Sequence, residues 1–410
     1  MKPDIYYFNP TCELAVVNGS DNYMASAKLR RFEEELSFLP GIIAQPKDIV
    51  LSACQPDQEY VDLLTKAGFI LPTFQVAENL FSDPGILEAE KGFLFPWGWS
   101  PSSHKQLLPL KAQCCTEFLS SPIAQWKDIH RELYSRKAAL AILNNIITRS
   151  RNCNYITGND LPEICTTHEQ IIQLQKKWEK VVVKAPWSAS GRGLQILRPD
   201  EYNQTNRQVI SGYIKQQGYV VVEPWHNKLL DLSFQFFSDG KGDIIYKGFT
   251  TFTTDQAGRY WGNHIQELPP DLEPSLKEFL LTNISEIKKT ICLTLTSSNY
   301  STEYSGWLGV DTMILKSTEG NFRFHPCLEI NCRFTMGAIA LKLRDHLAEG
   351  SVGEYKILHG KQGYFNQYCR NEMTIEPLEM DNGKIVSGFL PLTPMIPEST
   401  FGAYIKIMKE

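Results

Sequence analysis

The residues best suited to chemistry are spaced two apart in a short segment, Cys-Leu-Glu-Ile-Asn-Cys-Arg, at 327–333. Because side chains alternate along a strand, Glu329, Asn331 and Arg333 are predicted to share one face, about 7 Å apart. A carboxylate and an amide oxygen can ligate a hard cation, and a guanidinium can bind two phosphate oxygens at once. The pattern indicates a site for a magnesium-bound polyphosphate. The apolar residues on the opposite face argue against the alternative, a polar strand edge that faces water.

A second acidic residue, Asp311, lies upstream in the first strand of a predicted hairpin. If the hairpin folds about Glu319, Asp311 lies opposite Cys327 and diagonal to Glu329, about 7–8 Å away. A change of one residue in the turn would put Asp311 on the wrong face unless a β-bulge corrected the register. We expect any such bulge at Pro326, which cannot donate a ladder hydrogen bond.

A glycine-rich loop follows the short apolar strand predicted for 181–184. Lys184 ends this strand, and the small residues of the loop allow backbone N–H groups to approach phosphate oxygens. The loop is not a Walker loop or a dinucleotide fingerprint, because the residues that complete those motifs are missing. A protein-kinase lobe is excluded because the lysine precedes the loop and no H-R-D motif follows. Taken alone, such a glycine run is more typical of a plain hairpin turn.

Another strand is predicted for 219–225, and it ends in Glu223-Pro224. Proline makes the strand exit stiff, and the free carbonyl and amide groups beside it can bind an adenine edge. A further strand begins at Asp231. Considered by itself, the segment is more typical of an ordinary strand exit.

The order of these features is a helical lysine, a strand lysine with a glycine-rich loop, a Glu-Pro hinge, an acidic residue and a Glu-x-Asn-x-Arg strand. The helical lysine is Lys137, in Ser-Arg-Lys-Ala-Ala-Leu. In order and spacing, over about residues 130–340, the chain resembles the ATP-grasp superfamily. The Glu-x-Asn-x-Arg strand after an upstream acidic residue is the most specific part of this resemblance.

The resemblance implies a role for each residue of the nucleotide site. Lys137 and Lys184 would contact the phosphates and the adenine side, Glu223 and the backbone of Trp225 would hold adenine, and Asp231 or a neighbour would hold the ribose. The loop residues implied to close over the β- and γ-phosphates are Ser188, Ser190, Gly191, Arg192 and Gly193.

The resemblance also implies a metal and a catalytic set. Asp311, Glu329 and Asn331 would bind Mg²⁺ or Mn²⁺. The residues implied to act on the transferred phosphoryl group are Arg333, Arg192 and Lys184.

The implied fold is α/β and α+β, with an N-terminal Rossmann-like domain before a two-subdomain ATP-grasp fold. We expect the N-terminal domain at 1–125, the small subdomain with the phosphate loop at 126–218, and the large subdomain with the metal site at 219–345. A C-terminal extension at 346–410 is expected to pack on the preceding domains. A chain of 410 residues is long enough for two or three domains.

The first 125 residues independently predict a parallel sheet, because strands predicted for 5–8, 49–51 and 69–72 alternate with helices. Asn9 is predicted to cap the first helix, with Pro10 at its first position. Ligands bind beyond the carboxyl ends of parallel strands. The candidate substrate contacts there are Asn9, Thr11, Cys12 and Glu13.

Composition narrows the class of protein. The net charge is −5 without a basic block, so nucleic acid is not an expected partner. No apolar run has the length of a signal peptide or a membrane span. Ten cysteines occur without a C-x-x-C pair, which predicts reduced thiols in a cytoplasmic protein.

The resemblance implies an ATP-dependent ligase that joins a carboxylate to an amine or a similar nucleophile through an acyl phosphate, with release of ADP and phosphate. Small-molecule carboxylate and amine substrates are the expected partners, and a homodimer is left open. Two alternatives also remain open: a small-molecule kinase on the same scaffold, and a non-catalytic ATP-binding protein.

Overall fold

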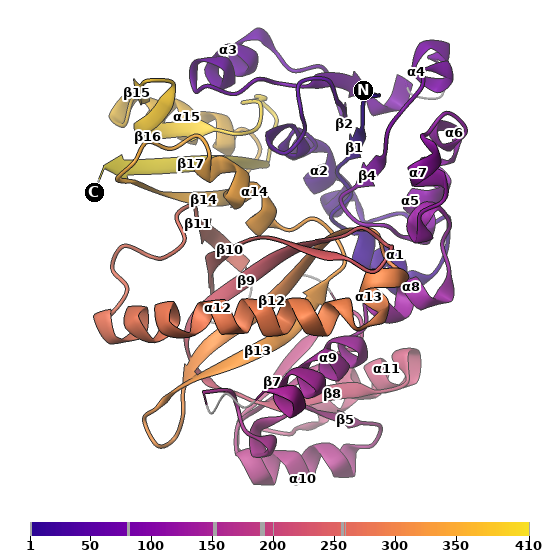
Figure 1. The fold of residues 1–410 in the computed structure, drawn as a ribbon, viewed down its shortest axis with the longest axis vertical. Helices are drawn as coiled ribbons and strands as arrows, with labels where there is room; N and C mark the ends of the chain where they lie inside the picture. Colours follow the sequence, from indigo (N-terminus) through magenta and orange to yellow (C-terminus); the bar gives the residue numbers. More distant parts are fainter. Residues whose placement is uncertain are drawn as a thin grey trace.

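The computed structural model describes residues 2–79, 83–150, 154–188, 193–199, 201–255, 258 and 260–409. Within these residues the strands form three sheets. Figure 1 shows the N-terminal sheet at the top, the small sheet that contains β5 to β8 at the bottom, and the largest sheet between them. None of the described helices is long and apolar enough to span a membrane.

The N-terminal sheet is parallel throughout, as the alternation of strands and helices predicts. Its strands, in spatial order, are β3 (Thr73–Val76), β2 (Ile49–Ser52), β1 (Ile5–Tyr7) and β4 (Leu94–Pro96). The helices described in this part are α1 (Cys12–Asn18), α2 (Ala27–Glu35), α3 (Gln58–Lys66), α4 (Pro84–Glu88), α5 (Pro101–Gln106), α6 (Leu108–Lys111), α7 (Thr116–Leu119) and α8 (Asp128–Leu133).

Two local predictions in this domain are wrong. The strand predicted for 69–72 instead starts at Thr73, after a proline that cannot donate to the ladder. The first helix starts at Cys12, so Asn9 is not its cap. The Asn9 amide instead donates to the Gly98 carbonyl at 2.8 Å and accepts from the Gly98 N–H at 3.3 Å. The Asn9 side chain, which the local sequence pattern predicts to be a helix cap, thus forms its hydrogen bonds with a residue that is distant in sequence.

The small sheet is antiparallel and has a core of its own. Its strands, in spatial order, are β5 (Glu163–Cys165), β8 (Val220–Pro224), β6 (Val181–Lys184) and β7 (Leu194–Leu197). The helices α10 (His168–Trp178) and α11 (Gln204–Gln217) pack on it.

The largest sheet contains nine strands with antiparallel neighbours. In spatial order they are β13 (Phe322–Asn331), β12 (Gly306–Lys316), β9 (Asn227–Ser238), β10 (Ile244–Thr254), β11 (Tyr260–His264), β14 (Ser351–His359), β17 (Phe401–Lys409), β16 (Lys384–Pro391) and β15 (Glu379–Asp381). The helices described here are α9 (Arg136–Arg149), α12 (Pro274–Thr296), α13 (Asn299–Thr302), α14 (Met336–Arg344) and α15 (Tyr364–Ile375).

Alternation along β9 separates the core from the site. Leu232, Phe234 and Phe236 are fully buried in the cluster that also holds residues of α9 and α12. The residues between them, Ser233 and Gln235, therefore point to the other face. Figure 1 shows α12 lying across one face of this sheet. The opposite face is the one that carries the polar site.

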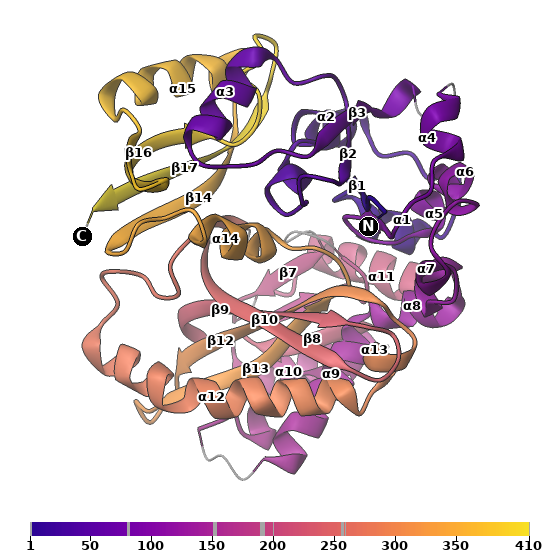
Figure 2. The ribbon, with the colours of Figure 1, turned by 45° about the horizontal axis from the view of Figure 1, so that its top comes forward.

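The C-terminal strands join the N-terminal domain to the large sheet. One apolar cluster contains residues of β1, α3, α14 and β17. Figure 2 shows α3 close to α15, and Arg370 of α15 forms an ion pair with Glu59 of α3. The first and last parts of the chain therefore share a single core.

Candidate active site

The β12–β13 hairpin brings two carboxylates face to face. It folds about Glu319 as predicted, because Lys316 pairs with Phe322. Further along, Asp311 pairs directly with Glu329. The prediction that Asp311 lies opposite Cys327 is wrong, because the register shifts where three residues of β13 oppose one of β12. This irregularity contains Pro326, so the bulge occurs where the proline predicts it.

Asp311 is held by hydrogen bonds on both oxygens. The Ser233 hydroxyl donates to Oδ1 at 2.7 Å, and the Asn331 amide donates to Oδ2 at 3.0 Å. Burial raises the pKa of Asp311 to about 6, and the negative charge of Glu329 adds to this effect. When this buried carboxyl group ionises, a cation bound beside it would offset the unfavourable negative charge.

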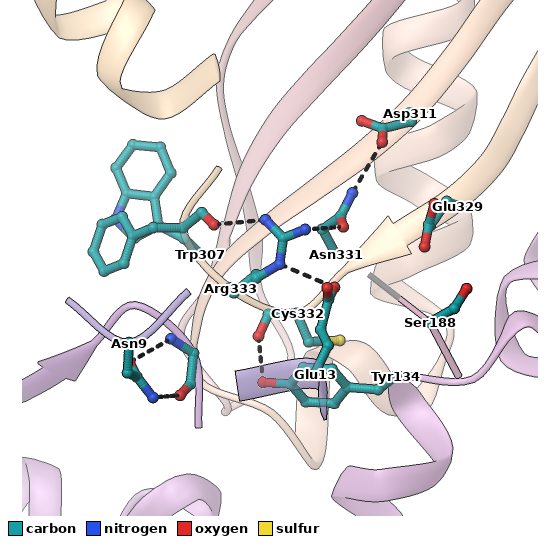
Figure 3. A network of polar contacts seen from close by, with 12 residues as sticks. Asn9, Glu13, Tyr134, Ser188, Trp307, Asp311, Glu329, Asn331, Cys332 and Arg333 are labelled. Carbon is teal, nitrogen blue, oxygen red and sulfur yellow. Dashed lines mark hydrogen bonds and ion pairs between the residues drawn. The ribbon is translucent and has the colours of Figure 1, made fainter. Parts of the chain in front are cut away.

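Arg333 connects this pair to the N-terminal domain. Its Nη2 donates to Asn331 Oδ1 at 2.8 Å, and its Nε donates to Glu13 Oε1 at 2.9 Å. Figure 3 shows the resulting path from Asp311 through Asn331 and Arg333 to Glu13. Although burial opposes its charge, the adjacent Glu13 carboxylate raises the pKa of Arg333. Glu329, Asn331 and Arg333 therefore surround one site, as the two-residue spacing predicts.

A residue next to Lys137 in the sequence, Arg136, also lies at this site, although it was not singled out from the sequence. Arg136 is the first residue of α9, and its Nη2 lies 3.2 Å from Glu329 Oε1 and 3.2 Å from Ser188 Oγ. Lys137 is exposed, because one helical step turns it about 100° away. The structure thus brings the Arg136 guanidinium against Glu329 and the start of the phosphate loop, and the nucleotide contact of Lys137 stays a prediction.

The small sheet contributes Lys184 and Glu223, which form a buried ion pair. The two residues lie on adjacent strands, since Val182 pairs with Glu223 and Lys184 pairs with Val221. Ser188 lies at the start of the predicted phosphate loop and Gly193 at its end. Ser190, Gly191 and Arg192 lie outside the described residues.

The hinge residues are less closely grouped. The Trp225 N–H donates to the Lys180 carbonyl at 2.9 Å, so this N–H is already engaged, and the Lys180 ammonium lies 4.5 Å from the Trp225 ring. Asp231 is buried and accepts from Lys228 at 2.5 Å and from Thr254 at 3.3 Å. Burial raises the pKa of Asp231, whereas Lys228 lowers it.

Two histidines near the hinge were not singled out from the sequence. His226 follows β8 and His325 lies on β13, and their ring centroids are 5.9 Å apart. Burial lowers the pKa of both rings. His325 is fully buried, and neither of its ring nitrogens has a hydrogen-bond partner among the described residues. Both rings are therefore neutral near pH 7.

Two supporting residues on β9 were also missed. Gln235 donates to the Ser233 hydroxyl at 2.8 Å and accepts from the Thr335 hydroxyl at 2.8 Å. Ser233 and Gln235 continue the two-residue spacing that starts at Asp231, so alternation along the strand could have found them. Arg136 was harder to predict. Arg136 and Lys137 are adjacent basic residues, and the position at which α9 begins determines which of the two side chains points toward the site.

The oxygen atoms suit a hard divalent cation. Asp311 and Glu329 provide carboxylates on paired strands, whereas the Asn331 amide turns its nitrogen toward Asp311 and its oxygen toward Arg333. In the described part of the chain, no three His, Cys, Asp or Glu side chains gather into a metal cluster. Mg²⁺ commonly uses one or two carboxylates together with water and phosphate oxygens.

In sequence, the chain is similar to the [butirosin acyl-carrier protein]–L-glutamate ligase of Niallia circulans. The two are 24% identical over 318 residues, which cover 76% of this chain and 66% of that protein. The chain thus matches slightly less than two thirds of the length of this relative. No family model matches the chain.

In fold, the chain is similar to biotin carboxylases. The Campylobacter jejuni enzyme, in a β,γ-ATP complex, has a TM-score of 0.53 at 11% identity, covering 100% of this chain and 88% of that one. The biotin carboxylase domain of the Hydrogenobacter thermophilus 2-oxoglutarate carboxylase, with MgADP and bicarbonate, has a TM-score of 0.52 at 11% identity. This second match covers 100% of this chain and 86% of that one. The likeness shows a shared fold.

Proposed function

From the premise that this chain has the ATP-grasp fold, we propose that it is an ADP-forming ligase that activates a small carboxylate with Mg-ATP. One observation carries this proposal: β12, β13 and α9 bring two carboxylates and two guanidiniums together. The paired carboxylates are Asp311 and Glu329, and the guanidiniums belong to Arg333 and Arg136. A reaction that gathers negative charge on phosphoryl oxygens needs this combination.

The residues of the small sheet would hold the nucleotide. Lys184 would exchange part of its contact with Glu223 for a phosphate oxygen, and Ser188 would begin the loop over the phosphates. Asp311, Glu329 and Asn331 would hold Mg²⁺ or Mn²⁺. When bound, the cation supplies positive charge that offsets the phosphate charge. The roles of Lys137, Trp225 and Asp231, and of the loop residues outside the described part, stay predictions.

The chemistry would proceed in two steps. A carboxylate oxygen of the substrate attacks the γ-phosphorus, the bond from that phosphorus to the bridging oxygen breaks, and ADP leaves. A nucleophile then attacks the acyl carbon, loses its proton, and displaces inorganic phosphate, which carries away one carboxylate oxygen. Arg333 and Arg136 would bind the transferring group in both steps, since guanidinium binds phosphate oxygens in a bidentate manner.

The sequence relative narrows the substrates to test. Its name says that it joins L-glutamate to an acyl-carrier protein. We therefore propose L-glutamate as the first carboxylate to test here, with either a small amine or an acyl-carrier protein supplying the nucleophile. A cytoplasmic location is part of the same proposal and rests on the cysteine pattern.

The test is ADP release with Mg-ATP and a panel of amino acids and small acids, with mass spectrometry of the products. For any carboxylate that supports turnover, ¹⁸O in its carboxyl group should appear in the released phosphate. A kinase would instead leave phosphate on its product and release none. A stable phosphorylated product, or unlabelled phosphate, would contradict the ligase proposal.

A further inference from the structure

Glu13 is a buried carboxylate with only half of its bonding capacity used. It lies on α1, is 8% exposed, and reaches across the domain boundary to Arg333. Its Oε1 accepts from Arg333 Nε at 2.9 Å, whereas its Oε2 is buried without a hydrogen-bond partner among the described residues. An unpaired buried carboxylate oxygen is costly, and such an atom at a reaction site indicates a ligand.

Neither of the neighbouring guanidiniums donates to this oxygen. Each nitrogen of Arg333 is engaged, since Nη1 donates to the Phe334 carbonyl and Nη2 donates to Asn331. Arg136 is committed to Glu329, to Ser188 and to the Ala185 carbonyl. The remaining charged group facing Glu13 is Glu329, which is negative. Oε2 therefore stays open to a donor that arrives with the substrate.

The position of Glu13 indicates which part of the substrate would carry this hydrogen-bond donor. Figure 3 shows Glu13 beside Arg333, with Glu329 and Ser188 nearby. Arg333 faces the proposed phosphoryl site, so Glu13 Oε2 lies close to the place where the substrate carboxylate would be activated. A donor group only a few bonds from that carboxylate can reach it.

We propose that Glu13 binds a protonated amine on the carboxylate substrate, and that this substrate is therefore an amino acid. The inference rests on the proposed ligase function. An ammonium group offers a positive charge and three donors, which suit an acceptor with an unpaired oxygen. Paired with Glu13, the amine stays protonated and has no lone pair for attack. The nucleophile of the second step then comes from the other substrate.

The inference is tested with pairs of substrates that differ only in the amine, such as L-glutamate and glutarate. ADP release gives kcat/KM for each member, and a thermal shift in the presence of MgADP gives binding without turnover. The amine-bearing member should be preferred. Glu13→Gln should lower this preference by about 100-fold, because it removes a hydrogen-bonded charge pair.

Glu33→Gln is the matched control. Glu33 is also a carboxylate of the N-terminal domain, but its Oε1 already accepts from the Thr11 N–H and hydroxyl. This variant should keep the preference for the amine. If Glu13→Gln does not fold, Glu13→Asp, which keeps the charge but withdraws the oxygen, should lower the preference in the same direction.

The outcomes separate this inference from the proposed function. Equal use of both members, or a preference that survives Glu13→Gln, would overturn the role of Glu13 while the ligase stands. No ADP release with any carboxylate would instead overturn the ligase proposal. The thermal shift would still decide whether Glu13 binds the amine, since it needs no turnover, and no amine-dependent shift would overturn that role.

Discussion

The carboxyl group of Asp311 makes stability depend on pH. Its pKa is raised from 3.8 to about 6 in the folded chain, mainly by burial and then by Glu329. A raised pKa means that the folded state binds the proton more tightly than the unfolded state does. The resulting stabilisation is complete below about pH 4 and is lost as the pH rises through 6, by about 3 kcal/mol at most.

We therefore expect wild type to lose up to about 3 kcal/mol of stability relative to Asp311→Asn as the pH rises from about 4 to 7 in EDTA, because only the wild-type side chain ionises. Chemical denaturation at several pH values measures this difference. Mg²⁺ should restore stability to the wild type above pH 6, where Asp311 is ionised, and much less at pH 5. An effect of Mg²⁺ that is the same at both pH values would contradict the assignment of Asp311 as a ligand.

Glu329 carries a separate prediction. Glu329→Gln keeps the shape of the side chain but removes its charge, so the proposed metal site and the ion pair with Arg136 are both weakened. We expect ADP release to fall by about 100-fold or more, by analogy with the loss of one charge-stabilising group at an active site. The melting temperature should change little. Glu319→Gln, in the exposed turn of the same hairpin, is the control and should keep full activity.

The site residues also show which side chains could and could not be predicted from the sequence. Strand alternation predicts that Glu329 and Asn331 share a face, whereas Arg333 lies two residues beyond the end of β13 and contacts Asn331 through its side chain. The choice between Arg136 and Lys137 depends on where α9 starts relative to β13. The start itself has a local signal, since Ser135 caps α9 and accepts from the Ala138 N–H, but the packing that turns Arg136 toward Glu329 has none.

At the level of elements, the loop between β6 and β7 depends on one glycine. Gly193 has a φ of +75°, and a Cβ there would lie 2.8 Å from the Cβ of Ser188. Its carbonyl accepts from the Ala185 N–H at 2.9 Å, which holds the two ends of the loop together. Gly193→Ala should therefore be strained by about 1–2 kcal/mol and should displace Ser188.

We expect Gly193→Ala to weaken ATP binding about tenfold, measured by calorimetry with Mg²⁺ present. Gly212→Ala is the matched control, because Gly212 lies in α11 and nothing occupies the space of its added Cβ. Alanine favours a helix over glycine by about 1 kcal/mol, so this variant should be neutral or stabilising. Equal ATP affinity in both variants would show that the loop conformation does not contribute to binding.

Much of the element order is readable from the sequence. The β12–β13 hairpin, its bulge at Pro326 and the parallel N-terminal sheet follow from alternation, turn residues and proline. The pairing of Asp311 with Glu329 could not be predicted in this way, because the bulge shifts the register of the hairpin further than the local sequence pattern indicates. The cap predicted at Asn9 fails for a similar reason, since its partner Gly98 is far away in sequence.

At the level of the whole molecule, the two ends of the chain are joined. The last residue of α2, Glu35, accepts from the N–H and hydroxyl of Thr400 at 3.0 and 3.1 Å and from the Phe401 N–H at 2.7 Å. The rings of Phe32 and Phe401 pack edge to face, with centroids 5.1 Å apart. The N-terminal domain, which supplies Glu13, is thus fixed to the sheet that contains β13, the strand that precedes Arg333.

This arrangement predicts that the N-terminal sheet and β17 unfold together. Glu35→Ala leaves the Thr400 and Phe401 N–H groups without their acceptor, at a cost of about 2–3 kcal/mol. In native-state hydrogen exchange, amides of β1 and β17 should lose protection by the same free energy, because both belong to one apolar cluster. Glu34→Ala is the control, since the Glu34 side chain is exposed, and should change protection by less than about 0.5 kcal/mol. Loss of protection in β17 alone would mean that the two ends unfold independently, and that the contact between Glu13 and Arg333 is not held by a shared core.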